Sequence, residues 1–182
     1  MRKISLFIAS SLDGYIARGS GEVDWLFTDQ DYGYTEFFTQ VDTLIMGHKT
    51  YQQVLSFGDY PYQEKEVFIF SRTEQGETDN QAKFVSSDWE GFINTLRQSS
   101  GGNIWLVGGT QIIYFFLLKG FIDELILSIH PIILGSGRQL IVNDSSLETM
   151  LILQDVKSFD SGLLQVTYTF KRKNTEITDI FV

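Results

Sequence analysis

The stretch IWLVGGTQIIYFFLLKG, residues 104–120, decides the fold of this chain. Its first four residues are apolar and predict a strand, and the two glycines with Thr110 predict a tight turn. The apolar residues 112–118 then predict a helix that ends at Gly120. Strand, glycine turn and helix in this order are typical of an α/β protein, in which such a turn lies at the ligand-binding edge of the sheet.

Segments on both sides of this stretch repeat the strand pattern. Residues 67–70 form a continuous apolar run, which is typical of a strand buried on both faces of a parallel sheet. The chain closes with two long segments joined through residues 160–162, and these predict an antiparallel hairpin. The predicted strands are residues 3–10, 15–17, 43–46, 67–70, 83–85, 104–107, 125–129, 151–159 and 163–171.

Helices are predicted between several of these strands. A first helix is indicated by apolar residues at helical spacing, namely Tyr34, Phe37, Phe38 and Val41. Residues 50–55 predict a second helix, and Ser87 with Glu90 fits a capping box in front of a further apolar stripe. Strands that alternate with helices and then end in a hairpin predict a mostly parallel sheet covered on both faces.

Length and composition indicate one globular domain. The 182 residues are 43% apolar, which is enough for a large core, and we expect the domain to span residues 1–173 with a C-terminal tail at 174–182. The apolar run that follows Arg2 and Lys3 is shorter than the core of a signal peptide, and no run is long enough to span a bilayer. These observations predict a cytoplasmic protein without a membrane segment.

Charge and residue usage narrow the classes of function. A net charge of −9 argues against nucleic-acid binding, which needs a basic surface, but a few grouped cations could still hold a phosphate-bearing cofactor. The chain has no cysteine, so disulfides and thiolate metal sites are absent. His48 and His130 lie far apart in sequence, and no pattern predicts a metal site.

Two glycine turns have the form of phosphate-binding sites. Gly47 is followed by His48, Lys49 and Thr50, and the second turn is the Gly-Gly-Thr of residues 108–110. Glycine lets the backbone approach a ligand closely, and the free amides at a helix start donate to phosphate oxygens. One such turn is equally well explained by an ordinary tight turn, but two in one domain favour phosphate binding. Neither matches G-x-G-x-x-G or the P-loop.

Ser71 and Arg72 add charge to the same region. They follow the buried segment 67–70, so Arg72 is expected to emerge at the same sheet edge as the glycine turns. Alone, Arg72 would be read as a solvated surface arginine. With His48 and Lys49 nearby it could complete a cationic pocket, because arginine recognises phosphate through its planar fork and lysine as a point charge.

The order of these motifs resembles the dihydrofolate-reductase superfamily. It is closer still to the branch typified by the reductase domain of the bifunctional riboflavin-biosynthesis deaminase–reductase. The resemblance covers nearly all of residues 3–171, and it is specific for fold and cofactor. The matching segments are SLDG at 11–14, LIMGHKT at 44–50, Ser71-Arg72, VGGT at 107–110, Asp123-Glu124 and the P-x-x-L-G-x-G of residues 131–137.

The resemblance implies a three-layer α/β/α sandwich that binds NADPH, with a cis peptide between Gly108 and Gly109. By position, Gly47, Lys49, Thr50, Gly108, Gly109, Thr110 and Gln111 would surround the pyrophosphate, Ser71 and Arg72 would hold the adenosine 2′-phosphate, and Ala9, Ile16 and Ala17 would line the nicotinamide. Family members usually carry arginine where this chain has His48. A neutral imidazole contributes less to binding a 2′-phosphate, so NADH stays an alternative cofactor.

The substrate side is less defined. Dihydrofolate reductases place a carboxylate on the first helix; counting back from Gly47 indicates Asp31, whereas counting forward from Trp25 indicates Asp29 or Gln30. The acidic stretch can also be read as a solvated helix start. Asp13 is either a turn residue or a group beside the active site, and Trp25 is either a core aromatic or a wall of the substrate pocket. Asp13 and Asp31 are the catalytic candidates.

Together these features predict an NADPH-dependent reductase of a small pyrimidine- or pteridine-like heterocycle. The resemblance makes it similar to 5-amino-6-(5-phosphoribosylamino)uracil reductase of riboflavin biosynthesis. The alternatives are a dihydrofolate reductase and a non-catalytic nucleotide-binding protein on the same fold. Long, aromatic-rich C-terminal strands and residues 131–137 suggest surface that a monomer would leave exposed. By analogy with the riboflavin branch, we expect a homodimer with this region at or near the interface.

Overall fold

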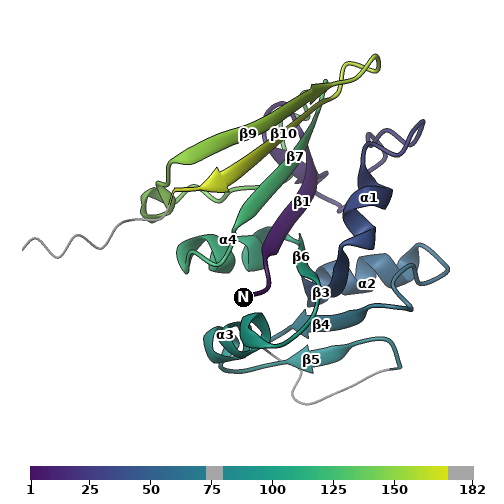
Figure 1. Cartoon of the computed structure of the whole chain (residues 1–182). Coiled ribbons are helices and arrows are strands. Elements are labelled where there is room, and N and C mark those ends of the chain that lie inside the picture. The colour runs from purple at the N-terminus through teal and green to yellow at the C-terminus, as the bar shows by residue number, and fades with distance from the viewer. Residues whose placement is uncertain (73–79, 172–182) are drawn as a thin grey trace, which may run out of the picture.

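A central eight-stranded sheet organises the molecule (Figure 1). The computed structural model describes residues 1–72 and 80–171. The sheet has the order β5 (Lys83–Val85), β4 (Glu66–Phe70), β3 (Val41–Gly47), β6 (Asn103–Gly108), β1 (Ile4–Ser11), β7 (Glu124–His130), β10 (Leu164–Phe170) and β9 (Leu151–Ser158). Neighbours from β5 to β7 are parallel, whereas β10 is antiparallel to both β7 and β9. The predicted parallel sheet and C-terminal hairpin are therefore confirmed.

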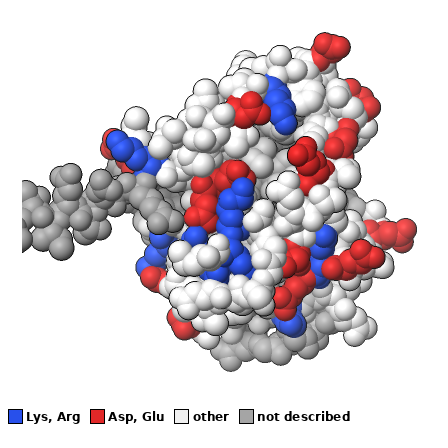
Figure 2. Space-filling model, viewed as in Figure 1, with Lys and Arg blue, Asp and Glu red and all other residues white. Residues whose placement is uncertain are grey.

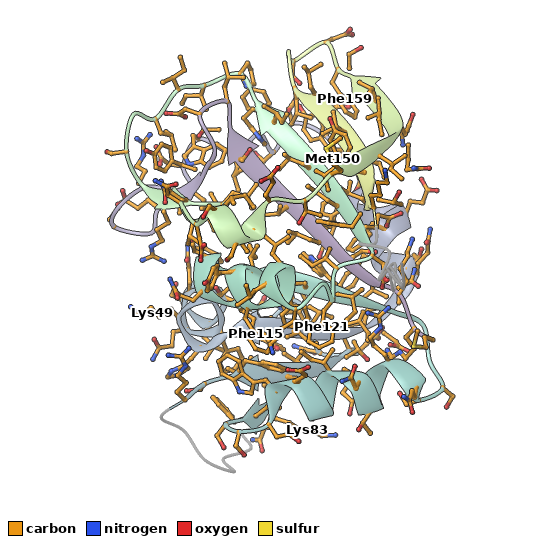
Figure 3. The ribbon with its side chains drawn as sticks, turned by 90° about the vertical axis from the view of Figure 1, so that its left-hand side faces the viewer. Lys49, Lys83, Phe115, Phe121, Met150 and Phe159 are labelled. Atoms are coloured by element: carbon orange, nitrogen blue, oxygen red, sulfur yellow. The ribbon has the colours of Figure 1, made fainter. Side chains whose placement is uncertain are left out.

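Helices cover both faces of this sheet. α1 (Tyr34–Thr39) and α2 (His48–Ser56) pack on one face, in a core with buried β3 residues such as Leu44. α3 (Trp89–Gln98) and α4 (Thr110–Leu118) pack on the other face, where Phe115 and Phe121 lie between the two helices (Figure 3). Two cores on opposite faces confirm the three-layer α/β/α sandwich.

A second, two-stranded sheet lies beside the large one. β2 (Tyr15–Ala17) pairs antiparallel with β8 (Arg138–Gln139), and neither belongs to the central sheet. Gly137, with φ of +152°, permits this pairing, because a Cβ there would lie 2.3 Å from the carbonyl oxygen of Ala17. The pairing brings the loop after β7 over the segment after β1, and a short 3₁₀ helix (Ser145–Leu147) follows.

The structure corrects two local predictions. Val41 is the first residue of β3 and pairs with Asn103 of β6, whereas the first helix ends at Thr39. The spacing of Val41 also fits a helix, but its pairing with a distant strand makes this β-branched residue part of the sheet. The predicted capping box is also wrong, because Asp88 caps α3 and its carboxylate accepts from the amide of Gly91 at 3.1 Å.

None of the described helices is long and apolar enough to cross a membrane. Among the described residues, no group of three or more histidine, aspartate or glutamate side chains could hold a metal ion. The predicted tail at 174–182 lies outside the described residues.

Candidate active site

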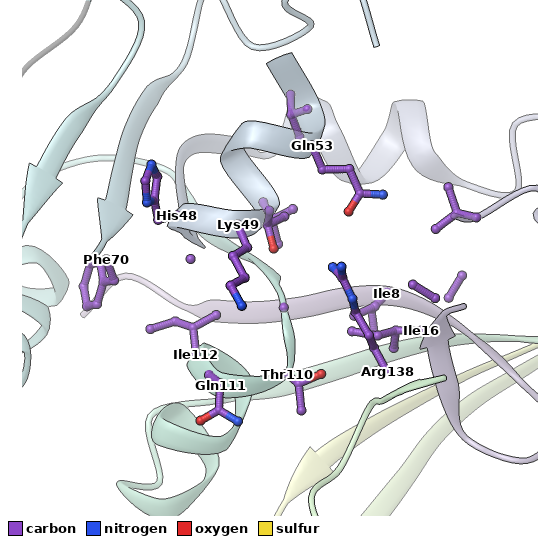
Figure 4. A pocket seen from close by; sticks show the side chains of 18 of the residues that line it. Ile8, Ile16, His48, Lys49, Gln53, Phe70, Thr110, Gln111, Ile112 and Arg138 are labelled. Atoms are coloured by element: carbon purple, nitrogen blue, oxygen red, sulfur yellow. The ribbon is translucent and has the colours of Figure 1, made fainter. Parts of the chain in front are cut away.

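A cavity of about 970 Å³ lies at the carboxyl ends of four parallel strands (Figure 4). Ala9 of β1, Gly47 of β3, Phe70 of β4 and Val107 of β6 all line it. This is the sheet edge where ligands of open α/β sheets collect. The volume is at the upper end of the range for small-molecule pockets, so the cavity can hold a ligand as large as a dinucleotide.

Two helices begin at this cavity. α2 starts at His48 directly after Gly47, and α4 starts at Thr110 directly after Gly109, with no side chain capping either start. The two starts are close together, since a Cβ added to Gly109 would lie 3.2 Å from Thr50 Oγ1. Amides of two converging helix N-termini form a site suited to anions.

The peptide between Gly108 and Gly109 is cis, as the resemblance implies. Gly108 ends β6, and Gly109 is the residue that precedes α4. Both glycines therefore belong to the turn that joins the buried strand to the start of the helix.

Positive side chains surround these helix starts. Lys49 extends into the cavity from α2, where it follows His48 (Figure 4). Arg72, two residues after the end of β4, also lines the cavity. The guanidinium carbon of Arg72 lies 5.8 Å from the ring centre of Trp89, in a cation–π contact. Arg138 of β8 contributes a further cation.

The charge of the described lining is positive only. Among the described residues that line the cavity there is no aspartate or glutamate, although the chain has 23 of them. Elsewhere in the described part of the chain, arginines pair with carboxylates: Arg2 with Asp42, Arg18 with Asp24 and Arg97 with Asp123. Within the described residues, Lys49 and Arg138 form no ion pair with a carboxylate, so this part of the site favours an anion.

The other half of the cavity is apolar and aromatic. Phe7, Leu26, Tyr34 and Trp105 line it, together with Ala17. The indole of Trp105 donates to the carbonyl of Phe7 at 3.1 Å, so its polar atom is satisfied within the protein. Burial raises the pKa of the Tyr34 phenol, and Tyr34 is therefore a hydrogen-bond donor at neutral pH. This half can take a flat ring and bond it at its edge.

The structure gathers nearly all of the predicted cofactor residues at this cavity. The lining includes Ala9, Ile16, Ala17, Gly47, His48, Lys49, Thr50, Ser71, Arg72, Gly109, Thr110 and Gln111. Gly108 lies behind the lining, where an added Cβ would contact Ile113 and Ile8.

The predicted substrate residues are not among the lining. Asp31 is exposed, and its carboxylate accepts from the amide and hydroxyl of Thr35 at 3.0 and 2.6 Å, which agrees with a helix-starting acidic stretch. Asp29 accepts from Tyr32. Trp25 is a buried core residue, 5.1 Å from the ring of His130. No carboxylate of α1 therefore reaches the cavity in the described structure.

Asp13 is a structural anchor in a turn. Its carboxylate accepts from the hydroxyl of Ser11 at 2.6 Å and from the amides of Leu134 and Gly135 at 3.0 and 2.7 Å. These bonds, with that of Ser11 the strongest, lower its pKa to about 2. Asp13 thus ties the loop after β7 to the turn after β1, and an exposed carboxylate of this acidity is unsuited to donate a proton at neutral pH.

Several lining residues were not predicted from the sequence. They include Tyr34, Gln53, Trp89, Trp105 and Arg138. The helical spacing of Tyr34 places it in the apolar stripe of the first helix, and this pattern does not predict its position at the cavity. For Arg138 the available signal was the glycine pair at 135 and 137, which marks a close backbone approach.

Comparison with known proteins identifies the family. The family model for the RibD C-terminal domain matches residues 2–165. The chain belongs to the RibD C-terminal domain family. Two relatives of similar length are uncharacterized proteins from Bacillus subtilis. YyaP is 38% identical over 92% of this chain and 94% of its own length, and YwjB is 37% identical over 89% of this chain and 95% of its own length.

Solved structures with this fold agree with the assignment. A candidate riboflavin biosynthesis protein from Shewanella sp. PV-4 is 34% identical, with a TM-score of 0.83 over 94% of this chain and all of its own. A bifunctional diaminohydroxyphosphoribosylaminopyrimidine deaminase/5-amino-6-(5-phosphoribosylamino)uracil reductase from Thermotoga maritima is 18% identical, with a TM-score of 0.73. The match covers 93% of this chain but 57% of the Thermotoga maritima protein. At this identity the likeness concerns the fold alone.

Proposed function

We propose that this protein is an NADPH-dependent reductase of a small pyrimidine- or pteridine-like heterocycle. The observation that carries the proposal is the division of one cavity into two chemistries. In one part, Lys49 lies beside two helix N-termini, and in another part Phe7, Tyr34 and Trp105 contact one another; the described lining holds no acid. A dinucleotide needs the first environment for its phosphates, and hydride transfer to a ring needs the second to orient the two rings.

The residues present fit this cofactor. Lys49, Thr50 and Thr110 would hold the diphosphate between the starts of α2 and α4, where Gly109 leaves room for close approach. Arg72 and Ser71 would bind the 2′-phosphate, next to Trp89. When bound, the cofactor supplies a hydride, and Ala9, Ile16 and Ala17 would line the nicotinamide. His48 contributes less charge than an arginine would, so NADH is expected to bind more weakly without being rejected.

The substrate would lie against Tyr34 and Trp105 in the apolar half. Tyr34 can donate a hydrogen bond to a ring carbonyl or nitrogen, and the surrounding aromatic rings exclude water. The lining has no described carboxylate for a protonated pterin, which disfavours a dihydrofolate reductase. A reductase of the riboflavin-pathway type agrees better with the family to which the chain belongs.

Binding and turnover measurements test the proposal in sequence. Isothermal titration with NADPH, NADH and FMN should show NADPH binding most tightly. A panel of pyrimidines and pterins should then contain a compound that causes loss of the reduced-nicotinamide absorbance. NADPH binding without turnover of any heterocycle would favour the non-catalytic alternative, and absence of nicotinamide binding would refute the proposal.

A further inference from the structure

Arg138 is a cation of the cavity wall that comes from outside the glycine turns. Its half-buried side chain extends into the cavity (Figure 4), and both Arg138 and Lys49 line it. Its hydrogen bond to the described part of the chain is long, 3.5 Å from Nη2 to the carbonyl oxygen of Ser20. No carboxylate of the described residues pairs with it, in contrast to Arg2, Arg18 and Arg97.

The backbone around Arg138 is held from several sides. Arg138 pairs with Ala17 in the small sheet, and the hydroxyl of Thr110 donates to the carbonyl of Gln139 at 2.6 Å. The carboxylate of Asp13 binds the same loop three and four residues earlier. The backbone of Arg138 is therefore fixed before a ligand binds. The planar guanidinium loses less freedom for each hydrogen bond that it forms than a lysine side chain would.

The guanidinium also lies against the glycine-rich segment 19–21. Gly21 has a φ of +103°, and a Cβ there would lie 2.8 Å from Nη2 of Arg138. On its other side, the carbonyl of Gly21 accepts from Gln53 Nε2 of α2 at 2.7 Å. Gly21 therefore lies between α2 and β8, and its missing side chain leaves the space that the guanidinium occupies.

We propose that Arg138 binds the diphosphate of the dinucleotide on its nicotinamide side, across the cavity from Lys49. Two contacts of its backbone indicate this phosphate. Arg138 pairs with Ala17, which lies at the proposed nicotinamide end of the cavity. The next residue, Gln139, accepts a hydrogen bond from Thr110, which lies at the start of α4. A planar fork suits two phosphate oxygens, and Lys49 adds a point charge. The assignment rests on the proposed function, which it extends by a residue from a different wall of the cavity.

Titrations of Arg138→Gln with ligands that contain different phosphates test this assignment. The dissociation constants of NADPH and NADH should both rise about tenfold or more, because a charged hydrogen bond is lost, and their ratio should stay constant. The affinity for 2′,5′-ADP, which lacks the nicotinamide half, should change less than about twofold. Arg138→Lys should recover part of the loss, since it keeps the charge.

Lys157→Gln is the matched control, because Lys157 is an exposed cation of β9 outside the cavity lining. It should bind all three ligands as the wild type does, and thermal unfolding should show that both variants are folded. Unchanged binding by Arg138→Gln, or an equal loss for 2′,5′-ADP, would overturn the assignment. If the wild type binds neither NADPH nor NADH, the proposed function fails. Inorganic pyrophosphate then tests Arg138: weaker binding by Arg138→Gln supports its role and equal binding overturns it.

Discussion

At the scale of single residues, His130 is held neutral by its surroundings. It is 3% exposed, its ring contacts Trp25 and Phe27, and its Nε2 accepts from the amide of Phe27 at 3.1 Å. Burial lowers its pKa below the usual 6.5. Because Trp25 and Phe27 flank Leu26, which lines the cavity, neutral His130 also supports one cavity wall.

This environment predicts a loss of stability on mild acidification. Below about pH 6.5 the unfolded chain binds a proton at His130 that the folded chain binds only at lower pH, so the free energy of unfolding falls as pH falls. The slope from this one group is at most about 1.4 kcal/mol per pH unit. His130→Gln, which keeps an acceptor but does not titrate, should show a shallower slope in denaturant unfolding between about pH 7 and pH 5. His48→Gln is the control, and an identical slope for wild type and His130→Gln would contradict the prediction.

Arg72 predicts selectivity between the two cofactors. Arg72→Ala should weaken NADPH by about tenfold to a hundredfold, since a charged hydrogen bond is worth about 1.5–3 kcal/mol, and NADH much less. Lys83→Ala is a suitable control in the neighbouring strand, because Lys83 pairs with Glu66 and does not line the cavity. Isothermal titration measures both cofactors. Equal losses for both would remove Arg72 from the 2′-phosphate site.

At the scale of elements, β9 is an edge strand with apolar side chains in solvent. All eight of its residues are exposed. Its apolar residues are 37–53% exposed, namely Leu151, Ile152, Leu153 and Val156, and the exposure of Leu164 of β10 lies in the same range. Met150 at the start of the strand and Ile133 in the loop after β7 are both 71% exposed (Figure 3 labels Met150). Edge strands of stable monomers are usually short or charged, and an exposed apolar strand of this kind is typical of a surface that a partner covers.

We propose that a second copy of the chain covers β9, with the loop at 131–137 at or near the interface. Replacing Leu153 and Val156 together by lysine should convert a dimer into a monomer, because it places charges in the apolar contact. Leu55→Lys, at an exposed apolar position of α2, is the control and should leave the mass unchanged. Light scattering measures the mass, and a monomeric wild type at working concentration would contradict the proposal.

At the scale of the whole molecule, the charge of the cavity lining differs in sign from the net charge of the protein. The net charge is −9, and on the face seen in Figure 2 acidic side chains adjoin many of the lysines and arginines. The described cavity lining contains cations and no acid. The local field at the cavity is therefore expected to be opposite in sign to the net charge, which lets an acidic protein bind a polyanion.

Two substitutions with the same change in net charge test this distribution. Gln111→Glu places an acid at the start of α4 in the cavity, and Gln52→Glu places one on the exposed face of α2. The first should weaken NADPH about fivefold, since unit charges a few ångströms apart repel by about 1 kcal/mol even in water. The second should have almost no effect. Equal effects in titrations at one ionic strength would show that net charge, and not the cavity, governs binding.

Sequence patterns were sufficient for most elements and for the glycine turns. Residues 67–70 and 104–107 are apolar runs bounded by turn residues, and their state depends mainly on their own composition. The starts of α2 and α4 were likewise readable, because a glycine before a helix acts through its immediate neighbours. Family membership then followed from the order of these local motifs.

Only the tertiary structure decided which distant residues share the cavity. Arg138 meets Gly21 and Ala17 because β8 pairs with β2, and Val41 is a strand residue because β6 pairs with it. The same packing leaves Asp31 bonded to Thr35 in solvent and directs Asp13 to the loop after β7. The contacts of Arg138 join segments that are more than a hundred residues apart in the sequence. No local pattern encodes such a strand pairing or such a close approach of two backbones.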